Sequence, residues 1–193
     1  TSVSRGLGDV YKRQMLFQEV RALPEQMPKD WKEPEGYDVI WHPAQRKGYS
    51  GVMSCSRVGM EEIGRGIDTD LDETRDPEGR VLHTKHNGMH CVNIYLPNGS
   101  SRDQRQAYKD QWIEDLMEWA EMFVGSEEPA ILCGDLNIAH TEDDIWDPKG
   151  NKRSSGFLEH EREWFTRLLD RGWHDLLRIH IGSQKGPYTL SLI

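Results

Sequence analysis

The stretch PAILCGDLNIAH, residues 129–140, decides the fold more than any other part of the chain. It begins with apolar residues, as a buried strand does, and places Asp135 and Asn137 two positions apart after Gly134. Side chains two apart on an extended strand point to the same face, so a carboxylate and a carboxamide are predicted to project together from the end of a strand. Asp and Asn after a strand also close turns or cap helices, and the pattern alone leaves that alternative open.

The rest of the chain alternates short β-type runs with longer helical patterns. Four further segments are predicted as strands: 37–42, 50–58, 80–86 and 90–96. His-Asn-Gly at 86–88 predicts a tight hairpin turn between the last two. Apolar residues recur at helical spacing in two segments, which predicts helices over 101–124 and 158–172. The sum indicates a layered domain of the α/β or α+β class.

The composition predicts a globular intracellular chain. Of its 193 residues, 36% are hydrophobic, and apolar runs of about four residues fall far short of the ~20 that a membrane span needs. The first fifteen residues lack the apolar centre of a secretory signal. Cys55, Cys91 and Cys133 are an odd number at wide spacings, which favours reduced thiols over a disulfide framework or a zinc site.

The charge balance limits how a polyanion could be bound. The net charge is −9 and the isoelectric point is about 5.4. An acidic chain has no overall attraction for nucleic acid, so such a partner must be held by a local basic surface or through a metal ion. The run Lys-Gly-Asn-Lys-Arg at 149–153 is a basic segment of that kind.

Other polar side chains follow apolar runs elsewhere in the chain. The segment 93–99 ends a predicted strand with Tyr95 and Asn98, and Glu19 follows a short apolar run near the start. With Asp135 and Asn137, an acid, an amide, a phenol and a second acid could meet at one sheet edge. Such a set suits phosphate ester hydrolysis, because a carboxylate can hold Mg²⁺ or direct the attacking water, and an amide or a phenol can hold phosphoryl oxygens.

The motifs together resemble those of a known enzyme family. The order and the intervals of five segments are similar to those of the exonuclease III/AP endonuclease family: QEV at 18–20, KGYSGV at 47–52, NIYLPNG at 93–99, ILCGDLNIAH at 131–140, and DPKGNKRSSGF at 147–157 followed by ER at 161–162. The resemblance extends over residues 15–189. It implies a four-layer α/β sandwich with two mixed β-sheets.

The resemblance also implies roles for individual residues. Glu19 matches the glutamate that binds Mg²⁺, with Mn²⁺ as an alternative metal, and Tyr95 matches the tyrosine at the scissile phosphate. Asp135 matches the aspartate that positions or activates the nucleophile, or protonates the leaving group. Asn137 matches the asparagine that hydrogen-bonds the phosphate. These are the predicted catalytic and metal-binding residues.

A second set is implied to contact DNA. Asn98 matches a phosphate-contacting asparagine, Lys47, Gly48 and Tyr49 match a loop that touches the backbone and minor groove, and Asn151 falls in a second DNA-facing loop. The implied reaction is incision 5′ to abasic sites, with 3′→5′ exonuclease and 3′-phosphodiesterase activity on double-stranded DNA. We expect a monomer, cytoplasmic in a bacterium or nuclear in a eukaryote, with no membrane partner.

The two ends depart from the family pattern. Residues 1–14 read as an unrelated or artefactual segment, 15–189 as a partial domain, and 190–193 as a non-native end. The Asp-His pair near the family's C-terminus has no counterpart, so we expect a truncated fold and weak or absent activity. Two alternatives stay open: a non-catalytic DNA-binding fragment, and another DNase I-like phosphatase, against which KGYSGV and GNKRSSGF speak.

Overall fold

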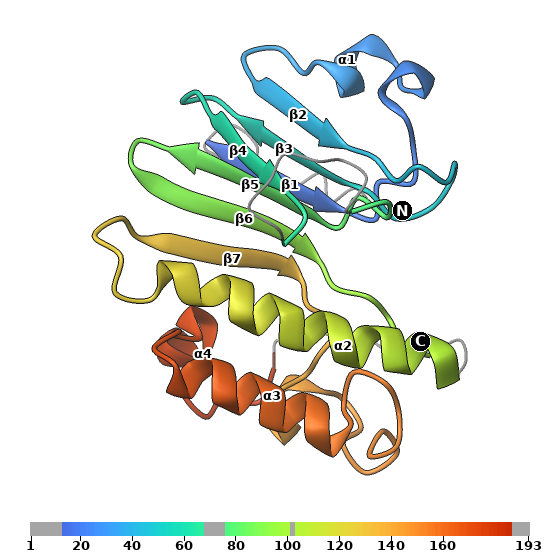
Figure 1. Ribbon diagram of the computed structural model, residues 1–193, viewed down its shortest axis with the longest axis vertical. Helices are drawn as coiled ribbons and strands as arrows, with labels where there is room; N and C mark the ends of the chain where they lie inside the picture. Colours follow the sequence, from blue (N-terminus) through green and yellow to red (C-terminus); the bar gives the residue numbers. More distant parts are fainter. Residues whose placement is uncertain (1–12, 68–75, 101–102, 187–193) are drawn as a thin grey trace. The chain divides into compact units, whose positions relative to one another are not determined.

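Two β-sheets and a set of helices make up the structure, a computed structural model that describes residues 13–67, 76–100 and 103–186 (Figure 1). The strands are β1 (Gln14–Gln18), β2 (Asp38–His42), β3 (Val52–Ser56), β4 (Glu61–Arg65), β5 (Val81–His86), β6 (Met89–Tyr95) and β7 (Ala130–Asp135). The α-helices are α1 (Lys29–Lys32), α2 (Asp103–Ala120), α3 (Glu159–Asp170) and α4 (Leu176–Ile181). Short 3-10 turns cover Pro24–Gln26, Glu121–Phe123 and Glu142–Asp144. The predicted α/β class with two sheets is confirmed.

The chain divides into two compact units. The first holds the described residues up to Tyr95 together with Ala130–Gly134, and the second holds Leu96–Pro129 and the described residues from Asp135 onward. All seven strands lie in the first unit except for the last residue of β7, and α2, α3 and α4 lie in the second.

The first unit consists of a three-stranded and a four-stranded sheet. The strand orders are β1-β3-β2 and β4-β5-β6-β7, and the pairs β1–β3, β2–β3, β4–β5 and β5–β6 are antiparallel. Figure 1 shows β7 beside β6 and running in the same direction. The two sheets pack against each other through β1 and β3 on one side and β5 and β6 on the other.

A buried side chain of β6 links the two sheets. Asn93 is fully buried, and its amide nitrogen lies 3.0 Å from the carbonyl oxygen of Met53 and 3.3 Å from that of Phe17. Its carboxamide oxygen accepts a hydrogen bond of 2.7 Å from Gln18 Nε2. Since a buried polar group without partners is costly, these bonds hold β1 and β3 at one position along β6.

The hairpin predicted at 86–88 is confirmed. Asn87 and Gly88 form the two-residue turn between β5 and β6, with φ angles of 49° and 81°. Positive φ at both positions is the type I′ geometry that Asn-Gly favours. Strand β6, which ends in Tyr95, is thereby paired with β5 along its length.

In the second unit, α2 packs against α3. Trp164 of α3 is fully buried and donates a hydrogen bond of 2.7 Å from Nε1 to the carbonyl oxygen of Ile113 on α2. The apolar spacing that predicted the long helix puts Ile113, Leu116 and Met117 on its buried side. No helix within the described ranges is long and apolar enough to cross a membrane.

Gly134 is required where β7 runs beside β6. Its φ is 135°, and a Cβ built there would overlap the carbonyl oxygen of Ile94. We expect Gly134→Ala to lower the free energy of unfolding by more than about 2 kcal/mol, measured by urea denaturation. Gly36→Ala is the matched control in the same unit, since its φ is 77° but its Cβ would meet open space; it should cost only about 1 kcal/mol. Equal losses would contradict the overlap.

His83 makes the stability of the fold depend on pH. It is buried on β5, with Nε2 2.8 Å from His90 Nδ1, and burial, followed by the charge of His90, lowers its pKa from 6.5 to about 4. The unfolded chain therefore takes up a proton that the folded chain does not. The contribution of neutral His83 to the free energy of unfolding should be fully present above pH 6.5. The free energy of unfolding should then fall by up to about 3 kcal/mol as the pH drops to about 4. Urea denaturation between pH 7.5 and 4.5 measures this loss, which His83→Gln should reduce; an unchanged slope would contradict it.

Candidate active site

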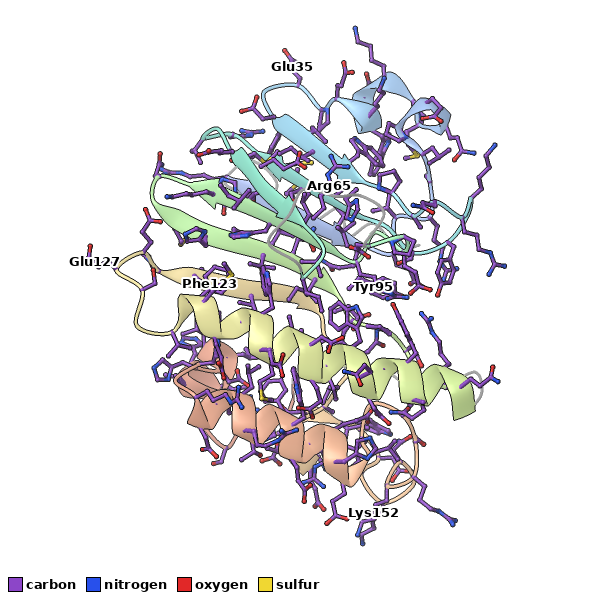
Figure 2. The ribbon with its side chains drawn as sticks, in the orientation of Figure 1. Glu35, Arg65, Tyr95, Phe123, Glu127 and Lys152 are labelled. Atoms are coloured by element: carbon purple, nitrogen blue, oxygen red, sulfur yellow. The ribbon has the colours of Figure 1, made fainter. Side chains whose placement is uncertain are left out.

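The first unit brings two predicted residues together. The hydroxyl of Tyr95, the last residue of β6, donates a hydrogen bond of 2.9 Å to Glu19 Oε1. Figure 2 labels Tyr95 at this end of the strand. Glu19 follows β1 directly, next to Gln18, whose bond to Asn93 sets the position of β1 along β6. A phenol and a partly exposed carboxylate thus face one another although 76 positions separate them.

Arg21 joins this pair and was not predicted from the sequence. Its guanidinium hydrogen-bonds the carboxylate of Glu19, and this bond, with the charge of Glu19, raises the pKa of Arg21. Tyr95 interacts with the same guanidinium. The side chain of Arg21 is 60% exposed, so its charge is available to an anion from solution. The sequence feature that could have identified Arg21 is its position, two residues after the predicted metal-binding acid.

Arg80 supports Tyr95 from the protein side. This buried guanidinium lies 4.8 Å from the centre of the Tyr95 ring and donates from Nη1 to the Tyr95 carbonyl oxygen at 2.8 Å. Its Nε donates to Glu78 Oε2 at 2.6 Å. The backbone of Arg80 is fixed in turn, since its N–H donates to the buried carboxylate of Asp76 at 2.7 Å. The ring of Tyr95 therefore has a rigid cationic support.

The loop predicted to contact DNA lies in the same unit. Lys47 and Gly48 are exposed, and Gly48 has a φ of 70°. Tyr49 is half-buried, and its hydroxyl donates to Glu78 Oε1 at 3.1 Å and accepts from Arg80 Nη2 at 3.3 Å. The loop thus shares Glu78 and Arg80 with the support of Tyr95.

In the second unit, Asp135 and Asn137 adopt a geometry that differs from the sequence prediction. The strand ends at Asp135, and Asn137 has a φ of 48°, so the two side chains do not share a strand face. Asp135 Oδ1 accepts the backbone N–H of Asn137 at 2.9 Å, which is a turn closed by a carboxylate. The same-face argument was wrong because it extended the strand to 138.

Asn137 is held tightly in this turn. Its side chain is buried and donates from Nδ2 to the carbonyl oxygen of Leu96 at 2.7 Å, and its own carbonyl oxygen accepts from Lys109 Nζ at 2.8 Å. The backbone N–H of Leu96 donates to the carbonyl oxygen of Asp135 at 2.8 Å. The segment after β6 and the segment after β7 are therefore fixed to each other within the second unit.

The two remaining predicted DNA contacts also lie in the second unit. Asn98 is exposed, and its Oδ1 accepts the backbone N–H of Ser100 at 2.8 Å. Asn151 is half-buried and donates from Nδ2 to the carbonyl oxygen of Asp147 at 2.9 Å. Each side chain bonds its own loop, so both shape the loops that carry them.

Unusual backbone conformations gather in the predicted motifs. Among the described residues, five that are not glycine have positive φ: Glu19, Arg21, Ser50, Asn87 and Asn137. Asn87 belongs to the hairpin, and the others lie in or directly beside the segments 18–20, 47–52 and 131–140. Ser50 Oγ is also buried and has no hydrogen-bond partner in the described part of the chain. Strained or unsatisfied groups cluster at functional sites, which agrees with the sequence motifs.

The ligands for a metal ion are few. Within residues 13–67, 76–100 and 103–186, no three His, Cys, Asp or Glu side chains lie close enough together to hold one. Glu19 offers a partly exposed carboxylate beside the Tyr95 hydroxyl. Mg²⁺ keeps several water ligands and accepts one or two protein carboxylates when a substrate phosphate supplies further oxygens. Glu19 fits an ion of that kind.

Residues 15–181 match the family model described as Endonuclease/Exonuclease/phosphatase family. This chain belongs to that family. It is 37% identical over 157 residues to the exodeoxyribonuclease of Bacillus subtilis, covering 81% of this chain and 61% of the relative. It is 35% identical over 179 residues to the DNA-(apurinic or apyrimidinic site) endonuclease of Dictyostelium discoideum, covering 91% of this chain and 48% of the relative. The predicted resemblance is confirmed.

Solved structures of the family have the same fold. An AP endonuclease from Archaeoglobus fulgidus superposes with a TM-score of 0.78 at 29% identity, over 90% of this chain and 65% of that one. A 3′-5′ exonuclease from Neisseria meningitidis gives a TM-score of 0.78 at 29% identity, over 90% and 66%. The chain thus spans 48% to 61% of the two curated relatives and about two thirds of these solved chains.

Proposed function

We propose that this chain carries the phosphodiester-cleaving residues of a DNA-repair nuclease, a metal-dependent AP endonuclease that incises double-stranded DNA 5′ to abasic sites. The observation that carries the proposal is the 2.9 Å contact between the hydroxyl of Tyr95 and the carboxylate of Glu19. A hydroxyl donor beside an exposed acid suits a metal-bound phosphate. The names of the relatives, an exodeoxyribonuclease and an apurinic or apyrimidinic site endonuclease, support the choice of DNA as substrate.

Glu19 and Tyr95 would act on the phosphate in the first unit. Glu19 would hold Mg²⁺, or Mn²⁺, with its carboxylate oxygens; when bound, the ion supplies positive charge against the charge that develops on the phosphoryl oxygens. The Tyr95 hydroxyl would donate a hydrogen bond to one of those oxygens. The support from Arg80 restricts the movement of the ring, so the donor is oriented before the substrate arrives.

Asp135 and Asn137 would act on the attacking water and on the phosphate. The carboxylate of Asp135 would orient the water and accept its proton, as a general base does. Its Oδ1 is held by the N–H of Asn137, which restricts its rotation. The turn also keeps the carboxamide of Asn137 at one place on the Leu96 carbonyl. A phosphoryl oxygen within reach of that carboxamide would gain a hydrogen-bond donor.

DNA would be held by exposed side chains of several loops. The proposed contacts are Lys47, Gly48, Tyr49, Asn98 and Asn151. The basic residues of the 147–157 loop would add phosphate contacts, because their side chains are exposed: Lys149, Lys152 and Arg153. Figure 2 shows Lys152 projecting away from the ribbon.

Incision of an abasic duplex tests the proposal. A 5′-labelled duplex with one tetrahydrofuran abasic analogue is mixed with excess protein and Mg²⁺, and the rate constant of incision is measured. We expect slow cleavage 5′ to the analogue, its loss in EDTA, and a further fall of about 10²- to 10⁴-fold in Asp135→Asn with duplex binding retained. Glu19→Gln should raise the Mg²⁺ concentration needed for half-maximal rate.

Glu35→Gln is the matched control for Glu19→Gln. Glu35 is also an exposed acid of the first unit, and Figure 2 labels it far from Tyr95. It should leave incision unchanged. Cleavage that persists in EDTA, or that Asp135→Asn leaves intact, would contradict the assignment. Binding of the duplex without any incision would instead favour a non-catalytic DNA-binding protein, and release of phosphate from inositol phosphates would favour the phosphatase alternative.

The basic loop makes a prediction about salt. Each phosphate contact that is removed should lower the slope of log K against log salt by about one unit. Replacing Lys149, Lys152 and Arg153 together by alanine should therefore weaken binding to all duplex sequences alike and reduce the slope by up to about three units. Fluorescence anisotropy titrations from about 50 to 200 mM salt, over which the affinity of such contacts falls steeply, measure both the affinity and the slope. Lys29→Ala, an exposed lysine on α1, should leave the slope unchanged.

A further inference from the structure

A fully buried ion pair lies in the second unit. Lys109 of α2 and Glu161 of α3 are both 0% exposed, and Lys109 Nζ lies 2.6 Å from Glu161 Oε1. Burial lowers the pKa of Lys109, and the charge of Glu161 opposes that shift. Apolar residues of similar volume often replace a buried ion pair at no loss of stability, so stability alone is a weak reason for this one.

Lys109 holds the turn that carries the predicted catalytic asparagine. Besides Glu161, its ammonium donates to the carbonyl oxygen of Asn137 at 2.8 Å and lies 3.4 Å from Ser155 Oγ. An ammonium has three donors, and these three acceptors account for them. Asn137 has a φ of 48°, a conformation that needs support from its surroundings. The negative charge of Asp135 also acts on Lys109.

Glu161 and Ser155 extend the same network to two further loops. Glu161 Oε2 accepts the backbone N–H groups of Gly156 at 2.7 Å and Leu158 at 3.0 Å, which fixes the end of the 147–157 loop. Ser155 Oγ accepts the N–H of Gly99 at 3.1 Å, next to Asn98. One buried pair therefore holds the loops that carry Asn98, Asn137 and Asn151.

We propose that Lys109 is a positioning residue: its ammonium, held by Glu161, sets the place of the Asn137 backbone and of the neighbouring phosphate-binding loops. The inference rests on the proposed function, because the part that Asn137 plays in cleavage belongs to it. If the loop moved by as little as about one ångström, the chemical step should slow more than DNA binding weakens. The reason is that the contacts to the DNA backbone are spread over several loops.

The test is the double variant Lys109→Met with Glu161→Gln, which removes the ion pair without leaving one charge buried alone. We expect a folded protein whose single-turnover incision rate falls about 10- to 100-fold, while the Kd for the abasic duplex changes less than about threefold. Lys109→Arg keeps a cation and donors at this place and should retain most of the rate.

Leu116→Ala is the matched control, because Leu116 is fully buried on the same helix and has no part in the network. It should lower the melting temperature by at least as much as the double variant does. Its incision rate, measured below that temperature, should stay within about twofold of the wild-type rate. A double variant that incises at the wild-type rate would overturn the inference. So would a loss of rate that follows the loss of stability equally in both proteins.

A readout independent of activity separates this inference from the proposed function. The N–H of Ala139, two residues beyond Asn137, donates to the carbonyl oxygen of Gly156 at 2.8 Å, so its hydrogen exchange reports the anchoring of the turn. Exchange of Ala139 should be about tenfold faster in the double variant and unchanged in Leu116→Ala. If the wild-type protein does not incise, the proposed function fails, and unchanged exchange of Ala139 would then overturn the positioning role as well.

Discussion

The buried carboxamide of Asn93 is the constraint on which the geometry of the first unit depends. Asn93 is fully buried, and its carboxamide bonds the carbonyl oxygens of Phe17 on β1 and Met53 on β3 and the side chain of Gln18. A shift of β1 by one residue would leave these polar groups unsatisfied and would turn Glu19 to the opposite face. The contact between Glu19 and Tyr95 is thus a consequence of how the two sheets are joined.

The same principle recurs in other parts of the molecule. Asp76 is buried, and its carboxylate accepts hydrogen bonds from the backbone N–H groups of Arg80 and Val81. The ring of His42 contacts the same carboxylate. These bonds fix the start of β5. In the second unit, the buried pair of Lys109 and Glu161 holds three loops. Polar groups inside the protein, each with its partners, position the loops that apolar packing would leave less well defined.

Local patterns predicted the regular elements well where the period was clear. The hairpin at 86–88, the long helix and the strands that end in Tyr95 and Asp135 were all found from residue types and spacing. Strand β4 was missed because Glu61, Glu62 and Arg65 give it the composition of an exposed edge strand. Helix α4 was missed because it has only six residues, too few to show a helical period.

The sequence by itself determined the family and which residue types stand at the motifs, because these depend on identity and order along the chain. It also indicated that the polar end of β7 could be a turn, and the bond from Asn137 to Asp135 shows that it is one. Only the tertiary structure decided that Glu19 meets Tyr95, that Arg80 lies against the ring, and that Lys109 is buried beneath Asn137. Those contacts join residues far apart in the chain, and their geometry exists only once the sheets and helices have packed.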